Sequence, residues 1–212
     1  AGGNVTTPGE GTFIYDEGKV VDLVATPDAG YQFIKWDGDV GTIVDTRAAN
    51  TTITMNGDYS IIALFGKTET VTDGTVDAKD MADTDVVVDG TATVSVAKYA
   101  DNPGGPPPIG FSALGKYIDV YVPNVTNVTQ IEIRLYYTAA EVAGVSEESL
   151  RLLWLDGTEW RQCSPYSGVN ATATDGYSGY LWAKIGTNTT PTLAQLTGMP
   201  FEAYGTPPVE YD

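Results

Sequence analysis

The stretch 130-QIEIRLYY-137 alternates polar and apolar side chains up to Leu135 and ends in two tyrosines. The four apolar side chains from Ile131 to Tyr137 therefore fall on one face of an extended chain, which is the pattern of a strand with one buried face. The same alternation runs through 116-KYIDVYV-122. Turn residues separate such segments at short, regular intervals along the whole chain, so the sequence predicts an all-β protein built from antiparallel sheets.

Segments of this kind lie on both sides of a Thr- and Asp-rich stretch, residues 67–85. We interpret that stretch as an acidic linker or a first strand, placed between an N-terminal module, residues 1–66, and a C-terminal antiparallel β-sandwich, residues 86–212. Asn56-Gly57 predicts a hairpin turn, because both residues tolerate positive φ. The other expected strands are 12–15, 20–25, 31–36, 51–55, 60–65, 91–99, 150–155, 160–162, 180–185 and 201–204.

The charge balance is strongly acidic, with 28 Asp and Glu against 11 Lys and Arg and a formal net charge of −17. Such a surface repels the phosphates of nucleic acids and anionic membrane lipids, so we expect no nucleic-acid partner and no membrane insertion. The sequence has no histidine, which excludes Ser-His-Asp and Cys-His catalysis and the usual zinc sites. The carboxylates cluster in turns, where Asp bonds locally. We therefore expect a protein that is not an enzyme.

Cys163 is the only cysteine, so no intrachain disulfide can form. We expect a buried, inert thiol, with an interchain link or a reactive thiol as the alternative. The longest apolar run, residues 61–65, is the length of a strand and too short for a membrane helix. The chain begins at Ala1 without a methionine, which we interpret as a mature chain whose leader has been removed, or a trimmed one.

Glycines and aromatic residues in the first 66 residues stand at the intervals of one known module. The matching positions are Gly3, Val5, Pro8, Gly9, Gly11, Phe13, Tyr15, Gly18, Val21, Leu23, Ala25, Pro27, Gly30, Tyr31, Phe33, Trp36, Gly38, Ile53, Met55, Ile61, Ala63 and Phe65. On these positions the segment resembles the divergent B-repeat family of internalin-type surface proteins. The resemblance implies a small extracellular β-grasp-like or β-sandwich module without known catalytic residues.

The remainder of the chain, from about residue 70, resembles a β-sandwich module of secreted archaeal and bacterial surface proteins. The resemblance rests on segments 115–120, 131–138, 148–152, 156–160 and 189–193. It implies no assigned activity. Together the two resemblances imply a secreted protein located outside the cell or at the cell surface.

Two acidic clusters are candidates for a structural calcium ion, since Ca²⁺ takes six to eight oxygen ligands and Asp-rich loops supply them. Neither has the spacing of an EF-hand loop, and a solvated acidic linker is the alternative for the first. The first cluster contains Asp73, Asp77, Asp80, Asp83 and Asp85, and the second contains Asp37 and Asp39 with Asp45.

The sequence also predicts sites of covalent modification. Six N-x-T sequons predict glycosylation in a host that has the machinery. They begin at Asn4, Asn50, Asn124, Asn127, Asn170 and Asn188.

Aromatic side chains opposite the apolar face of their strand predict an interface or a sugar-stacking platform, and terminal segments predict strand addition to a neighbour. The predicted interface residues are Val5, Tyr117, Tyr121, Trp182, Val209 and Tyr211.

The sequence thus predicts a non-enzymatic extracellular structural protein. We expect it to self-associate into a homo-oligomer, a filament or a surface layer through contacts between strand edges. The alternative is a monomeric carbohydrate-binding or cell-adhesion module, in which exposed aromatic rings such as Trp182 hold glycans.

Overall fold

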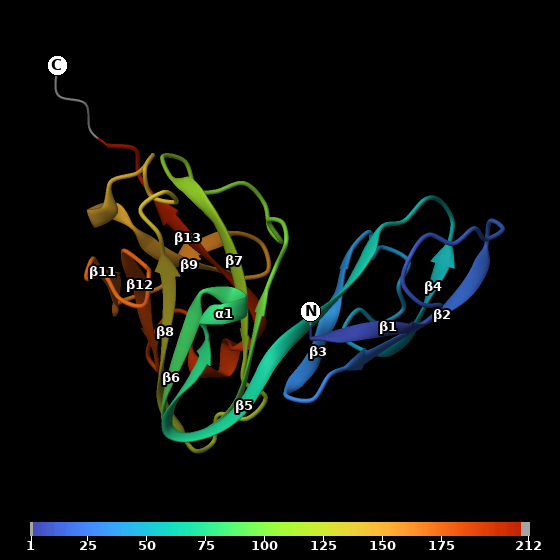
Figure 1. The fold of residues 1–212 in the computed structure, drawn as a ribbon, viewed down its shortest axis with the longest axis horizontal. Coiled ribbons are helices and arrows are strands. Elements are labelled where there is room, and N and C mark those ends of the chain that lie inside the picture. The colour runs from blue at the N-terminus through green and yellow to red at the C-terminus, as the bar shows by residue number, and fades with distance from the viewer. Residues whose placement is uncertain (1, 209–212) are drawn as a thin grey trace. The chain divides into compact units, whose positions relative to one another are not determined.

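The computed structural model describes residues 2–208 and is almost entirely β-structure (Figure 1). The chain divides into two compact units between Thr68 and Glu69. The predicted all-β fold with two modules is confirmed. None of the helices among the described residues has the length and apolar character needed to cross a membrane.

The N-terminal unit contains two antiparallel sheets. One has the order β1-β2-β4, from strands β1 (Gly3–Thr7), β2 (Lys19–Pro27) and β4 (Asn50–Met55). The other pairs β3 (Tyr31–Gly38) with the first part of β5 (Ile61–Ala78). No helix occurs among the described residues of this unit, so it takes the sandwich form of the two alternatives that the sequence left open.

The core of this unit lies between the inward faces of the two sheets. Trp36 is the largest fully buried side chain, and its indole N–H donates a 3.0 Å hydrogen bond to the carbonyl of Ala48. The ring of Phe33 lies 5.4 Å from that of Trp36 and 6.0 Å from that of Phe65, centroid to centroid. Burial of these aromatic rings is the main favourable term available to a unit of this size.

The C-terminal unit is built on one continuous set of paired strands, in the order β10-β9-β13-β7-β6-β8-β12-β11. Strand β6 joins its two halves, because Thr84–Gly90 pairs with β8 and Ser95–Lys98 pairs with β7. Strand β9 lies close to β11 and β12, so the set folds over one core in the manner of a sandwich. The bounds are β6 (Thr84–Lys98), β7 (Ser112–Tyr121), β8 (Val128–Tyr137), β9 (Arg151–Leu155), β10 (Trp160–Gln162), β11 (Ser167–Asn170), β12 (Gly179–Ile185) and β13 (Thr197–Gly205).

Helical structure in the C-terminal unit is short. Helix α1 (Lys79–Ala82) joins β5 to β6, and two single 3₁₀ turns occupy Glu147–Ser149 and Leu193–Gln195. The acidic stretch 67–85 thus contains the second part of β5, helix α1 and the first residues of β6. The hydroxyls of Thr70 and Thr72 contact those of Thr93 and Thr91 on β6, at 2.7 and 3.0 Å.

Two local predictions are wrong. Residues 12–15 form no strand; they belong to a loop whose glycines, Gly9 and Gly11, have φ of +118° and +123°. Asn56-Gly57 closes no hairpin, because β4 pairs with β2 and β5 pairs with β3. A turn signal reports only local backbone freedom, whereas the partner of each strand is set by which pairing buries its apolar face.

Candidate functional site

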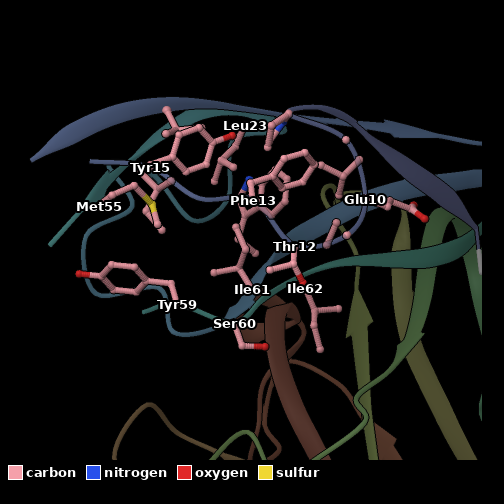
Figure 2. Close-up of a pocket in the computed structure, with 18 of the residues that line it drawn as sticks. Glu10, Thr12, Phe13, Tyr15, Leu23, Met55, Tyr59, Ser60, Ile61 and Ile62 are labelled. Atoms are coloured by element: carbon pink, nitrogen blue, oxygen red, sulfur yellow. The ribbon is translucent and has the colours of Figure 1, made fainter. Parts of the chain in front are cut away.

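A cavity of about 580 Å³ opens between the two sheets of the N-terminal unit (Figure 2). Its walls are inward side chains of both sheets, and the loop formed by residues 8–16 covers part of it. Figure 2 shows Phe13 near the middle of the lining side chains, with Tyr15 and Met55 on one side and Glu10 on the other. The lining residues are Gly3, Val5, Pro8, Gly9, Glu10, Gly11, Thr12, Phe13, Tyr15, Val21, Leu23, Trp36, Ile53, Met55, Tyr59, Ser60, Ile61, Ile62, Ala63 and Phe65.

The strand pattern explains why the walls are apolar. Val21 and Leu23 alternate on β2 with exposed neighbours, and Ile53 faces the same interior from β4. The volume lies in the range of about 300–1,000 Å³ that is usual for ligand sites, and a volume of this size without protein atoms leaves its apolar walls poorly packed. The cavity therefore offers both apolar side chains and polar groups to a bound segment.

The rim of the cavity carries exposed apolar side chains. Phe13 is 43% exposed and Ile62 is 51% exposed, and both line the cavity. Ile14, the next residue after Phe13, is 96% exposed. Glu10 is the one charged residue among the described residues that line the cavity. The opening thus combines exposed apolar side chains with a single charge and with polar residues such as Thr12 and Ser60.

Strand β1 supplies a further feature of the same site. It pairs with β2 alone, so no strand of the described chain pairs with its other edge. Gly3 and Val5 of this strand line the cavity. An incoming strand along the β1 edge would extend the β1-β2-β4 sheet and place alternate side chains toward the cavity. The predicted interface residue Val5 thus lies at an edge strand.

These features define a small two-sheet β-module with an apolar interior that is open at one side. Residues 1–69 match the family model of the divergent InlB B-repeat domain, which confirms the resemblance of this segment. No curated protein and no solved structure matches the chain. The family is a surface repeat domain and not a known enzyme family, and it indicates an extracellular surface or adhesion-type protein. The resemblance of the C-terminal module stays a prediction.

Lysines contact three carboxylates of the first predicted calcium cluster, those of Asp77, Asp83 and Asp85. The ammonium group of Lys79 contacts Asp85 at 3.0 Å and Asp77 at 3.1 Å. Although burial opposes it, these two carboxylates raise the pKa of Lys79. The Tyr136 hydroxyl also donates a hydrogen bond to Asp85, at 2.9 Å. Burial and this bond raise the pKa of Tyr136 to about 12.

Asp83 belongs to a second ion-pair network beside α1. Its Oδ2 atom lies 2.8 Å from the ammonium of Lys116 and 3.1 Å from that of Lys98. The Tyr177 hydroxyl donates a 2.8 Å hydrogen bond to Oδ1. Burial opposes ionisation of this carboxyl, but the bonds from Lys116 and Tyr177 hold the pKa of Asp83 below its usual value. Lys116 also contacts Glu141, at 2.9 Å.

The structure does not bring the other predicted calcium ligands together. Asp73 accepts a hydrogen bond from the backbone of Gly90, Asp39 accepts one from the backbone of Ser60, and Asp37 pairs with Lys35. Asp80 lies in the first turn of α1. Within residues 2–208, no group of three or more Asp, Glu or Cys side chains is placed to hold a metal ion. Calcium binding therefore stays an untested prediction.

A carboxyl group that the sequence did not single out is fully buried in β13. Glu202 has no exposed surface, and neither of its oxygens makes a hydrogen bond of ordinary geometry. Burial raises the pKa of Glu202 to about 7, and the nearby hydroxyls of Tyr204 and Tyr117 only partly oppose this. The sequence 201-FEAY-204 does not predict a buried carboxyl. Alternation would place Glu202 on an exposed face, whereas this strand is buried on both faces.

The predicted contact residues fall into three groups. Tyr117 is 8% exposed and packs against Trp160, so the prediction that it contributes to an exposed face is wrong; β7 is a central strand with both faces covered. Tyr121 is half-buried, as is Trp182, whose indole covers Gly168. Val209 and Tyr211 lie outside the described residues.

The predicted glycosylation sites are mostly accessible. Asn4, Asn50, Asn124, Asn127 and Asn188 are exposed. Asn170 is half-buried, and its amide donates a 3.0 Å hydrogen bond to the Tyr180 hydroxyl. Exposure permits a glycan at the first five, and use of any of them stays a prediction.

Cys163 is buried in the core of its unit, and burial raises the pKa of its thiol, which keeps the thiol protonated.

Proposed function

We propose that this chain is a non-enzymatic extracellular structural protein that binds further copies of itself through the N-terminal unit. The observation that carries the proposal is the cavity between the two sheets, beside an edge of β1 with which no strand of residues 2–208 pairs. The occupant we propose is an apolar segment of a second copy, running as a strand along β1 and placing side chains over the cavity. Repetition of a contact of this kind builds a filament or a layer if the two contacting surfaces differ.

Charge restricts where a second copy can bind. A chain with a net charge of −17 repels its own copies over most of its surface. The cavity rim is the exception, because Glu10 is the one charge among the described lining residues while Phe13 and Ile62 are half exposed. An apolar segment of a second copy therefore meets less repulsion where it covers this rim.

The chain also carries a side chain suited to such a contact. Ile14 is 96% exposed and directly follows Phe13 on the loop that covers the cavity. An isoleucine gains about 1.5–3 kcal/mol when it moves from water into an apolar site. In the proposed contact, Ile14 on the loop of one copy can enter the cavity of the next copy, so each contact buries one such side chain.

Assembly of the full chain tests the proposal. Sedimentation velocity and negative-stain electron microscopy are carried out over a range of protein concentrations at low and at raised salt, which screens the repulsion between copies. We expect oligomers or fibres that increase with concentration and salt. A chain that stays monomeric under all of these conditions refutes self-assembly.

Matched variants test the location of the contact. Ile62→Glu places a charge on the cavity rim and should shift the chain toward monomers. Val44→Glu adds the same charge at a residue that is 79% exposed and does not line the cavity, and it should assemble like the unchanged chain. If both variants assemble to the same extent, the chain self-associates but the cavity is not the site of contact.

A further inference from the structure

The ammonium of Lys116 occupies an unusual position in the C-terminal unit. The lysine side chain is only 5% exposed, and its Nζ lies between two carboxylates, 2.8 Å from Asp83 Oδ2 and 2.9 Å from Glu141 Oε1. Glu141 is itself held in place, because its other oxygen accepts a 2.7 Å hydrogen bond from the backbone of Thr138. The Tyr177 hydroxyl approaches Asp83 from the other side and donates to Oδ1 at 2.8 Å.

We propose that Lys116 and Asp83 condense into an intramolecular amide. A bond forms between Nζ of Lys116 and Cγ of Asp83, and the bond between Cγ and Oδ2 breaks. The ammonium gives up two protons and the leaving oxygen takes both, so one water molecule is released. The reaction needs no oxidant, reductant or further reactant.

The neighbours of the two groups supply the acid–base chemistry of this step. Glu141 accepts a proton from the ammonium, which frees the lone pair of Nζ for attack, and returns protons to the departing oxygen. Tyr177 donates to Oδ1, where negative charge develops in the tetrahedral intermediate. Lys98, 3.1 Å from Oδ2, neutralises the carboxylate and leaves it easier to attack.

Proximity is the reason that an amide can form from an ion pair here. Condensation of a free amine with a free carboxylate is unfavourable in dilute water. Groups held in the right geometry react as if at effective concentrations of about 10⁵–10⁸ M. Lys116 is nearly buried, so the water that would hydrolyse the product is largely excluded from Nζ.

The product would be a covalent bridge in a chain that cannot form an intrachain disulfide, since Cys163 is its only cysteine. It would tie β7 to the junction of α1 and β6, across 33 positions of sequence. Closing such a loop restricts the unfolded chain, as a disulfide does. A load-bearing extracellular unit would gain resistance to unfolding from this bridge.

Intact mass spectrometry of the purified full chain tests the proposal. We expect a mass lower than that of the sequence by one water molecule. Cyclisation of an Asp-Gly pair loses the same mass, and the chain contains several such pairs. A tryptic digest distinguishes the two, because the amide joins the peptide containing Asp83 to the one containing Lys116 and blocks cleavage after Lys116.

Single substitutions test which side chains take part in amide formation. Lys116→Arg keeps the positive charge and should restore the full mass, whereas Lys79→Arg, at the other lysine held between carboxylates, should leave the water loss unchanged. Glu141→Gln should yield a larger fraction of unlinked chain that still folds, as judged by circular dichroism. Full mass of the unchanged chain overturns the proposal, as does a water loss that maps to other residues.

Discussion

Replacement of Glu202 by glutamine should change how the stability of the C-terminal unit depends on pH. Glu202 is fully buried on β13, and its pKa is raised by burial from 4.5 to about 7. The folded state therefore binds a proton more tightly than the unfolded state does. The contribution of Glu202 to stability is greatest below pH 4.5, where the group is protonated in both states, and it is lost as the pH rises from 4.5 through about 7.

The size of the effect follows from the same two values. A tenfold difference in proton affinity corresponds to about 1.4 kcal/mol, so the rise from 4.5 to about 7 amounts to a loss of about 3 kcal/mol of unfolding free energy above pH 7. For a unit of this size that is a fall in Tm of roughly 10 °C. The Glu202→Gln variant has no proton to lose, so this fall should be absent from it.

The assay is thermal unfolding between pH 5 and pH 8, followed by near-ultraviolet circular dichroism. The chain has no histidine, and the carboxyls whose pKa is lowered, such as Asp83, are ionised throughout this interval. The measured quantity is the difference in Tm between the unchanged chain and Glu202→Gln as a function of pH. Glu148→Gln, which removes an exposed glutamate of the same unit, is the control. A difference that stays constant from pH 5 to pH 8 would show that the reasoning about Glu202 is wrong.

Three further outcomes follow from the packing and the ion pairs. Gly90→Ala should destabilise the C-terminal unit by at least about 2 kcal/mol in chemical denaturation, because φ is +109° and a Cβ would lie 2.0 Å from the carbonyl oxygen of Asn127. Phe201→Ala should lower the same free energy by about 3–5 kcal/mol, since the ring is fully buried in the core, and a loss below 1 kcal/mol would contradict this packing. Millimolar calcium should leave Tm unchanged relative to a chelator, because Lys79 already neutralises Asp85; a clear rise in Tm would support calcium binding.

Periodic strands could be predicted from the sequence because each of them carries its own signal. The alternation of 130–137 predicts β8, and the structure places Ile131, Ile133 and Leu135 in the core. The same reasoning is wrong for residues 12–15. Phe13 and Tyr15 on either side of Ile14 give the alternation of a strand, but the segment follows glycines with positive φ. Local alternation cannot distinguish a strand from a loop whose apolar side chains cover a cavity.

The candidate site was less predictable than the fold. The cavity is bounded by residues from β1 to β5, and its existence depends on how completely two sheets fill the space between them. No single segment encodes that volume. The contact of Lys116 with Asp83 likewise joins a central strand to the residue after a four-residue helix that no sequence signal had indicated.

The sequence by itself determined the all-β class, the two modules, the acidic charge and the absence of histidine chemistry, because these depend on composition and on the order of residues along one strand. The spacing of glycines and aromatic residues also predicted the family of the N-terminal module. Only the tertiary structure decided which strands pair, that Tyr117 is covered, that Glu202 is buried, and that lysines pair with Asp77, Asp83 and Asp85. Each of these depends on groups far apart in the chain, whose approach is set by the burial of apolar faces and not by any local preference.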